Sequence, residues 1–299
     1  MSQIVVGVDA GGTSCIAARA ADGAIERVVK HGPANASSIG VAAAAQSMIA
    51  AIEEVMGVQH PAAIYIGAAG AGREDLHAAI RSFIAGRYPH VALGIGDDAQ
   101  IALRAAIPQG PGIVLVAGTG TIAFADTGSA TYRCGGLGYL IGDEGSGYSL
   151  GAAALRLVAK AYDGRAPQDA FVERIARAFG IDSLEGLLAG VYVQPAPIDR
   201  MADMAALVIE LASGGDRTAS KLVQAHAGEC ADLLKATARK AGLIDASPRV
   251  ALCGGLLREN SVFSFLLQTR VTGDIPGVDI VRASEEPYAG AVRLAQGLL

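Results

Sequence analysis

The chain contains the same short pattern twice, about a hundred residues apart. Ile4–Asp9 is an apolar segment ending in a carboxylate, Gly11–Ser14 is a turn of glycine and hydroxyl residues, and another apolar segment follows. Residues 113–117, 118–121 and 122–125 repeat this order. Apolar runs rich in β-branched residues predict buried strands, so each copy is predicted to be a strand, a glycine turn and a return strand. Two such copies indicate two similarly built halves.

Each glycine turn is a candidate phosphate cradle. Glycines let backbone N–H groups approach an anion closely, and the neighbouring hydroxyl groups add donors. An ordinary β-turn is the alternative for either copy, because short glycine motifs recur by chance. The lysine-bearing loop GxxxxGK[ST] is absent, so two opposed turns would be a different solution to holding one polyphosphate. The residues concerned are Gly11, Gly12 and Thr13 in the first turn and Gly118, Thr119, Gly120 and Thr121 in the second.

Composition narrows the class of protein. A chain of 299 residues with 52% apolar and 18% charged residues is long enough and apolar enough for two folded domains. The net charge of −5 argues against a nucleic-acid or anionic-membrane partner. We expect no transmembrane helix and no signal peptide, since no apolar run of sufficient length and no basic leader occurs. The four cysteines have no CxxC spacing and are expected to be reduced thiols in a cytoplasmic protein.

The order of predicted elements indicates an α/β protein with mixed sheets flanked by helices. Hairpins come first, and helices then alternate with strands, while the second half carries more helix. Residues 107–112 contain two prolines and two glycines and are the best candidate for an interdomain hinge. We therefore predict an N-terminal domain over residues 1–107 and a larger C-terminal domain over 108–299, with the last helix free to pack back across the hinge.

Three aspartates stand at the ends of predicted strands. Asp9 follows the first strand, where it is placed to hold a divalent cation directly or through water, or to cap a turn. Asp97 and Asp98 follow the strand at residues 91–95, and a helix is predicted from Ala99. Such strand ends are where sites gather in α/β proteins, although aspartate is also a preferred helix N-cap. One of the pair can cap the helix while the other acts as a general base.

The ordered set of motifs resembles a known superfamily. DAGGT, AGTGT and the later CGG turn at residues 253–255 are similar to the acetate and sugar kinase, heat-shock cognate and actin superfamily. CGGLGYLIGDEGSG at residues 134–147 resembles the N-acetylglucosamine kinase-like branch of the BadF/BadG/BcrA/BcrD ATPase family. The resemblance implies two actin/hexokinase-like (ribonuclease H-like) domains with mixed five-stranded sheets and an active-site cleft between them. It also implies ATP and Mg²⁺ as cofactors and, commonly, a homodimer.

The resemblance assigns roles to particular residues. The family's base is an aspartate followed by alanine, which matches Asp98, with Asp97 as the fallback. Its nucleotide turn matches Gly254 and Gly255, which could otherwise be a plain turn. Asp9 would hold the metal. Asn35, otherwise a routine turn residue, and Asp143, otherwise a favourable charge before a helix, would contact the sugar. The implied sugar-binding set is Asn35, Asp98, Gly120, Gly136 and Asp143.

The implied activity is transfer of phosphate from ATP to the 6-hydroxyl of an amino sugar. The family's GTGS-Asn reads GTGT-Ile here, so Ile122 replaces a polar side chain, and Leu137 stands where some members have tryptophan. These departures leave N-acetylglucosamine and free glucosamine both open as the substrate. The alternatives are an ATPase activase of an acyl-CoA reductase or dehydratase, which needs paired cysteines, and a non-catalytic sugar or nucleotide sensor. Five scattered histidines support neither a zinc site nor a Ser/His/Asp hydrolase.

Overall fold

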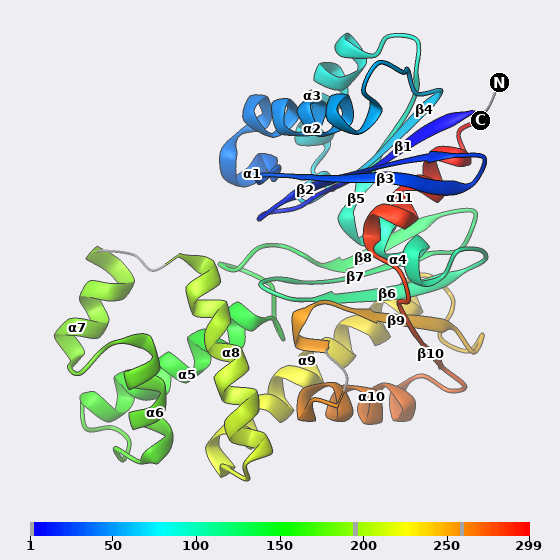
Figure 1. Cartoon of the computed structure of the whole chain (residues 1–299). Helices are drawn as coiled ribbons and strands as arrows, with labels where there is room; N and C mark the ends of the chain where they lie inside the picture. The colour runs from blue at the N-terminus through cyan, green and yellow to red at the C-terminus, as the bar shows by residue number, and fades with distance from the viewer. Residues whose placement is uncertain (1–2, 194–196, 258–259) are drawn as a thin grey trace. The chain divides into compact units, whose positions relative to one another are not determined.

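The computed structural model describes residues 3–193, 197–257 and 260–299. The chain divides into two compact units, each built on one sheet (Figure 1). The first unit comprises the chain up to Gly112 together with Val281–Leu299, and the second comprises Ile113–Ile280.

The first sheet is mixed and has the strand order β3-β2-β1-β4-β5. The pairs β1/β2 and β2/β3 are antiparallel, whereas β4 runs parallel to both β1 and β5. Asp9 lies beside Gly67 in the β1/β4 register, so the carboxyl ends of the parallel strands meet at one edge of the sheet. The strands are β1 (Ile4–Ala10), β2 (Cys15–Ala21), β3 (Ala24–His31), β4 (Ala63–Ala68) and β5 (Ala92–Asp97).

Helices cover both faces of the first sheet (Figure 1). Alternate strand residues such as Val6 and Ile64 pack with α2 and α3, while Val5 and Tyr65 face α4 and α11 on the opposite side. Period-two alternation in the strands therefore supplies two apolar layers. The helices of this unit are α1 (Ala36–Ile39), α2 (Val41–Met56), α3 (Glu74–Arg87), α4 (Asp98–Ala106) and α11 (Pro287–Gln296).

The last helix belongs to the first unit by close packing. A Cβ added at Gly7 of β1 would collide with the backbone nitrogen of Val292 in α11. A Cβ at Gly290 of α11 would collide with the carbonyl oxygen of Ile101 in α4. Two glycines therefore let α11 touch both the central strand and the helix that begins at Asp98.

The second sheet repeats the topology of the first. Its order is β10-β9-β6-β7-β8, with β6/β9 parallel and β7/β8 antiparallel, so β6 to β10 take the places of β1 to β5. The two similarly built halves predicted from the repeated pattern are thereby confirmed. The strands are β6 (Gly112–Ala117), β7 (Thr121–Asp126), β8 (Thr131–Gly135), β9 (Arg249–Cys253) and β10 (Asp279–Arg282).

One large apolar core joins the second sheet to its helices. Leu115 and Ala123 of the sheet pack with Leu150, Val208 and Leu234 from three long helices. Two short segments, α7 and the π-turn η1, were not predicted from the sequence. The helices are α5 (Gly147–Tyr162), α6 (Ala170–Phe179), α7 (Leu184–Leu188), η1 (Ala189–Val193), α8 (Ile198–Ser213), α9 (Arg217–Lys240), the 3₁₀ turn η2 (Gly255–Leu257) and α10 (Val262–Asp274).

The segment predicted as a hinge is held by hydrogen bonds from Arg104. The Arg104 guanidinium of α4 donates to the carbonyl oxygens of Ile107 (3.3 Å) and Gly110 (2.8 Å). Ile107 itself is fully buried. Any hinge movement at residues 107–112 therefore stays a prediction, and it would have to begin from this bonded arrangement.

Candidate functional site

The first glycine turn projects from the end of β1. The N–H of Gly11 donates to the carbonyl oxygen of Ser14 at 2.9 Å, which closes the turn. Gly12 and Thr13 are exposed at its tip, and a Cβ on Gly12 would meet nothing within 4 Å. The tip is therefore open to a ligand that accepts hydrogen bonds from backbone N–H groups.

Asp9 lies beside this turn in an unusual electrostatic setting. Burial, reinforced by the charge of Glu286, raises the pKa of the Asp9 carboxyl to about 6. A cation would favour the charged carboxylate and offset that burial. One carboxylate next to a candidate phosphate-binding turn suits Mg²⁺, which takes one or two carboxylates together with substrate phosphates and waters. Among the described residues no group of three or more His, Cys, Asp and Glu forms a metal cluster of the protein's own.

Asp97 and Asp98 stand where β5 ends and α4 begins. Asp97 occupies the N-cap position but makes no side-chain capping bond, so the expected cap is absent. The Asp98 carboxylate instead accepts the N–H of Ala99 at 2.8 Å. Part of the Asp98 residue still reaches solvent, although protein surrounds its carboxyl group. Desolvation by burial, followed by the charge and hydrogen bond of Asp97, raises the pKa of Asp98 to about 7.

The first turn of α4 is fixed from the neighbouring strand. The Tyr65 hydroxyl of β4 donates to the side-chain oxygen of Gln100 at 2.7 Å. The Tyr65 ring lies over Gly94 and its hydroxyl over Gly96, where a Cβ at Gly96 would be 2.5 Å from the hydroxyl oxygen. These bare glycines in β5 make room for the tyrosine, which holds the helix turn that carries Asp98.

Asn35 has the structural role that its turn context indicates. Its side-chain oxygen accepts the N–H of Ser37 at 2.9 Å and caps the short helix α1. The Ser37 hydroxyl would be 2.8 Å from a Cβ at Gly70, so the positive-φ glycine after β4 leaves space for it. The Asn35 amide nitrogen is not used by the cap and can donate to another group.

The second glycine turn is tied into the second unit by several bonds. The N–H of Gly118 donates to Gly120 O (3.0 Å), and the N–H of Gly147 at the start of α5 donates to Gly118 O (2.8 Å). The Thr119 hydroxyl donates to the Asp199 carboxylate of α8 at 3.1 Å. The turn therefore lies against the first turn of α5, where the positive end of a helix favours anions.

Asp143 and the glycines near it hold the other side of this turn. The N–H of Thr121 donates to the Asp143 carboxylate at 3.2 Å, and the N–H of Gly136 donates to Thr121 O at 2.8 Å. Asp143 has φ +57°, a left-handed conformation that aspartate tolerates better than most residues. Burial raises the pKa of its carboxyl, against the opposing hydrogen bond from Thr121.

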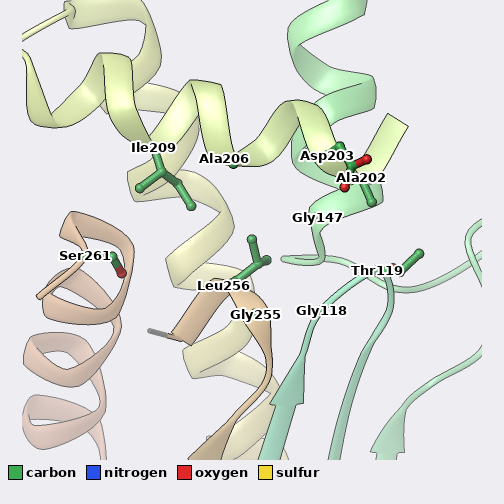
Figure 2. Close-up of a pocket in the computed structure, with 10 residues that line it drawn as sticks. All are labelled: Gly118, Thr119, Gly147, Ala202, Asp203, Ala206, Ile209, Gly255, Leu256 and Ser261. Atoms are coloured by element: carbon green, nitrogen blue, oxygen red, sulfur yellow. The ribbon is translucent and has the colours of Figure 1, made fainter. Parts of the chain in front are cut away.

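A cavity of about 480 Å³ opens beside the second turn (Figure 2). The turn and the start of α5 lie at one end, the η2 turn begins beside Gly118, and Ser261 at the N-cap of α10 lies toward the other end. Helix α8 forms the remaining wall. The lining residues are Gly118, Thr119, Gly147, Ala202, Asp203, Ala206, Ile209, Gly255, Leu256 and Ser261. The size is that of a drug-sized ligand, with polar and apolar groups both present.

The two glycines of the CGG turn have different surroundings. Gly254 has φ +107°, and a Cβ there would collide with the carbonyl oxygen of Ala117 in β6. Gly255 has open space around its Cα and lines the cavity. The first glycine is thus required by backbone packing, and the second leaves room in the cavity.

Sequence reasoning missed the wall that α8 contributes. Asp203 and Ile209 belong to an amphipathic helix of the kind that ordinarily packs on a core. The signal that could have found it is the spacing of Gly147 and Gly151 in α5. A Cβ at Gly151 would collide with Met201 O, so the bare face of α5 draws α8 close to the glycine turn.

The repeated mixed sheets define the class of fold as two actin/hexokinase-like domains, each with a five-stranded sheet flanked by helices. The crystal structure of a provisionally named N-acetylglucosamine kinase from Chromobacterium violaceum has this fold. It aligns with a TM-score of 0.79 at 24% identity and covers 98% of this chain and 99% of that one. Within the described residues no helix is long and apolar enough to cross a membrane.

The chain belongs to the BadF/BadG/BcrA/BcrD ATPase family, whose model matches residues 6–295. It is 25% identical over 301 aligned residues to the N-acetylmuramic acid/N-acetylglucosamine kinase of Clostridium acetobutylicum, covering 98% of each chain. It is 31% identical over 183 residues to the glucosamine kinase of Vibrio cholerae, covering 59% of this chain and 62% of the relative. The family resemblance predicted from the motifs is confirmed, and the curated relatives are sugar kinases.

Proposed function

We propose that the protein is an ATP-dependent amino-sugar kinase that phosphorylates the 6-hydroxyl of N-acetylglucosamine or glucosamine. The observation that carries this proposal is the cavity of about 480 Å³ that is lined by the glycine turn at Gly118 and Thr119, by bare Gly255 and by the apolar side chains of Ile209 and Leu256. A nucleotide has the matching character, with anionic phosphates at one end and a flat, largely apolar base at the other. Kinase relatives and the ATPase family support the same reading.

In this proposal the nucleotide phosphates bind at Gly118 and Thr119, next to the N-terminus of α5. The base lies between Ile209 and Leu256, and bare Gly255 leaves room beside it. Gly11, Gly12 and Thr13 of the first unit contact the terminal phosphate. Asp9 would hold Mg²⁺, which supplies charge neutralisation on the transferred phosphoryl group when bound.

Asp98 is the proposed general base. A base must be deprotonated enough to accept a proton at working pH and basic enough to take it, which is the case for a carboxyl with a pKa of about 7. Asp98 would accept the proton from the attacking sugar hydroxyl as that oxygen bonds to the γ-phosphorus and ADP leaves. This step requires that the sugar held by Asp98 and the nucleotide held by the glycine turns react with each other.

The proposed sugar contacts are Asn35 and Asp98 in the first unit and Gly120, Gly136 and Asp143 in the second. Ile122 is packed on the Cα of Gly136, since a Cβ there would be 3.0 Å from the isoleucine side chain. By the family resemblance this position would carry a polar side chain, and Ile122 stands there instead. This substitution leaves the substituent on carbon 2 without that polar contact and keeps both amino sugars as candidates.

The test is a panel of acceptors with ATP and Mg²⁺, followed by ADP production. N-acetylglucosamine, glucosamine, N-acetylmannosamine and glucose are compared with a no-sugar control. We expect ADP to form with one or both glucosamine-type sugars at least tenfold faster than with glucose, and we expect mass and NMR spectra to place the phosphate on carbon 6. Equal ADP release with and without every sugar would contradict the proposal and favour a sensor or an activase.

Asp203→Ala is expected to raise the KM for ATP about tenfold with little change in the KM for sugar. Among the described residues that line the cavity, Asp203 alone carries a charge, and a carboxylate there can accept hydrogen bonds from ribose hydroxyls. Loss of a hydrogen bond with a charged partner is worth about 1.5–3 kcal/mol. The matched control is Glu210→Gln, an exposed carboxylate on the same helix that pairs with Arg174. An unchanged KM for ATP in Asp203→Ala would show that the nucleotide does not contact this wall.

The activase alternative finds no support among the cysteines. Burial raises the pKa of the Cys15 and Cys230 thiols to about 12 and that of Cys253 to about 11. Cys15 and Cys230 are buried, so neither thiol is on a surface where a second subunit could share a cluster. We further propose a cytoplasmic location, where ATP is available. The homodimer implied by the resemblance stays a prediction, which light scattering can check.

A further inference from the structure

The backbone of Thr121 joins the loop at residues 134–147 to the glycine turn at Gly118–Thr121. Thr121 closes the turn at Gly118–Thr121, and both of its peptide groups are bonded to residues 134–147. Its N–H donates to the Asp143 carboxylate at 3.2 Å, and its carbonyl oxygen accepts the N–H of Gly136 at 2.8 Å. Asp143 and Gly136 are the two members of this loop that the proposed function gives to the sugar.

The packing at this junction leaves little freedom. A Cβ at Gly120 would be 3.0 Å from one Asp143 carboxylate oxygen and 3.3 Å from the other, so the turn lies directly on that side chain. Asp143 is mostly buried and holds a left-handed φ of +57°. Residues in such conformations persist where the surroundings fix them, and they cluster at functional sites. Asp143 does not line the nucleotide cavity.

We propose that Asp143 is a positioning residue for the phosphate turn as well as a sugar contact, so that sugar binding and nucleotide binding are energetically coupled through Thr121. This inference rests on the proposed function, because it takes the turn to hold phosphate and the loop to hold sugar. A sugar hydroxyl that donates to Asp143 fixes the carboxylate in the place where it also holds the Thr121 N–H. Because this carboxylate already holds the turn, the position that a bound sugar fixes for it is passed to the turn, and the affinity of the turn for nucleotide changes with it.

The coupling has two measurable consequences. Saturating sugar should tighten binding of Mg²⁺ and a non-hydrolysable ATP analogue, and the analogue should tighten sugar binding by the same factor, because linkage is reciprocal. A coupling of about 5–150-fold is typical. Removal of the Asp143 side chain should also weaken the analogue when no sugar is present, which a residue that only touches sugar would not do.

The deciding experiment is calorimetric titration of the analogue into sugar-free protein. Asp143→Gly deletes the carboxylate and accepts the positive φ, and we expect the Kd to rise about tenfold through loss of a bond to a charged group. Asp143→Asn keeps an oxygen for the Thr121 N–H, so we expect a smaller rise in the sugar-free Kd but a loss of sugar affinity. Circular dichroism melting of each variant establishes that it is folded.

Glu144→Gln is the matched control. Glu144 is the next residue, carries the same charge and is exposed, so its neutralisation should leave both the sugar-free Kd and the coupling factor as in the wild type. An unchanged sugar-free Kd in folded Asp143→Gly, or a coupling factor of one in the wild type, would overturn the inference. Failure of the wild type to bind the analogue at all would instead refute the proposed function.

Discussion

Asp98→Asn is expected to lower kcat by about 10²- to 10⁴-fold, the range for loss of a general base. Asparagine has nearly the shape of aspartate, and its side-chain oxygen can still accept the N–H of Ala99, which Asp98 accepts at 2.8 Å. The KM values for sugar and ATP should therefore change much less than kcat. In the wild type, kcat should fall as the pH drops below about 7, because burial and Asp97 raise the pKa of Asp98 to about that value.

The same substitution should make the protein more stable at alkaline pH. The folded-state pKa of Asp98 lies above the value of about 3.9 expected in the unfolded chain, so the folded state binds the proton more tightly. The stabilisation from that proton is complete below pH 4 and is lost as the pH rises through about 7. Asp98→Asn removes this loss, and its Tm should exceed the wild-type Tm at pH 8 but match it near pH 4.

Asp97→Asn tests which of the two neighbouring carboxylates is the base. The charge of Asp97 raises the pKa of Asp98, so its removal should keep turnover and move the acid limb of the pH profile to lower pH. Kinetics over pH 5–9 and thermal melts at the two pH values provide the measurements. If Asp97→Asn is the inactive variant and Asp98→Asn is active, then Asp97 is the base.

Gly254→Ala should mainly lower the stability of the protein, whereas Gly255→Ala should mainly weaken nucleotide binding. A Cβ at Gly254 would meet the backbone of Ala117, and its φ of +107° is unfavourable for alanine, so we expect a destabilisation of about 2–5 kcal/mol. That corresponds to a fall in Tm of roughly 2–4 °C for each kcal/mol in a domain of this size. The main effect of this variant is on folding.

Gly255→Ala should fold as the wild type does but bind nucleotide more weakly. Its added methyl group meets nothing within 4 Å in the protein and enters the cavity that Gly255 lines. We expect the KM for ATP to rise about tenfold through overpacking against the base, with a Tm shift near zero. Denaturant melts and ATP titrations of the pair measure both effects. An unaltered KM in Gly255→Ala would place the base elsewhere.

The repeated strands and turns could be predicted because their causes are local. Short apolar runs rich in β-branched residues, each followed by a glycine turn, leave few other structures for Ile4–Asp9 or for residues 113–125. The position of Asp98 was predicted as well, since strand and helix patterns meet there. Its paired environment follows from the same adjacency, because Asp97 is its neighbour in the chain.

The junction at Thr121 could not be predicted, because its cause is tertiary, and the cavity has only an indirect sequence signal in the spacing of Gly147 and Gly151. Asp143 is 22 residues from Thr121 in the sequence, and no periodic pattern shows that its carboxylate accepts that N–H. Helix α8 reads as an ordinary amphipathic helix, and only the packing of Met201 on Gly151 turns part of it toward a ligand. Asn35 illustrates the opposite case, since its capping bond to Ser37 is what a turn residue ordinarily makes.

The packing of helix α11 affects the order in which the two units become fully folded during translation. The helix follows Ile113–Ile280 in the sequence, yet it packs on Gly7 of β1, which precedes that whole unit. The second unit can therefore complete its core while one face of the first sheet is covered by α4 alone. Newly made chains should acquire protease resistance in the second unit first, with residues 4–106 fully protected only after α11 has emerged from the exit tunnel.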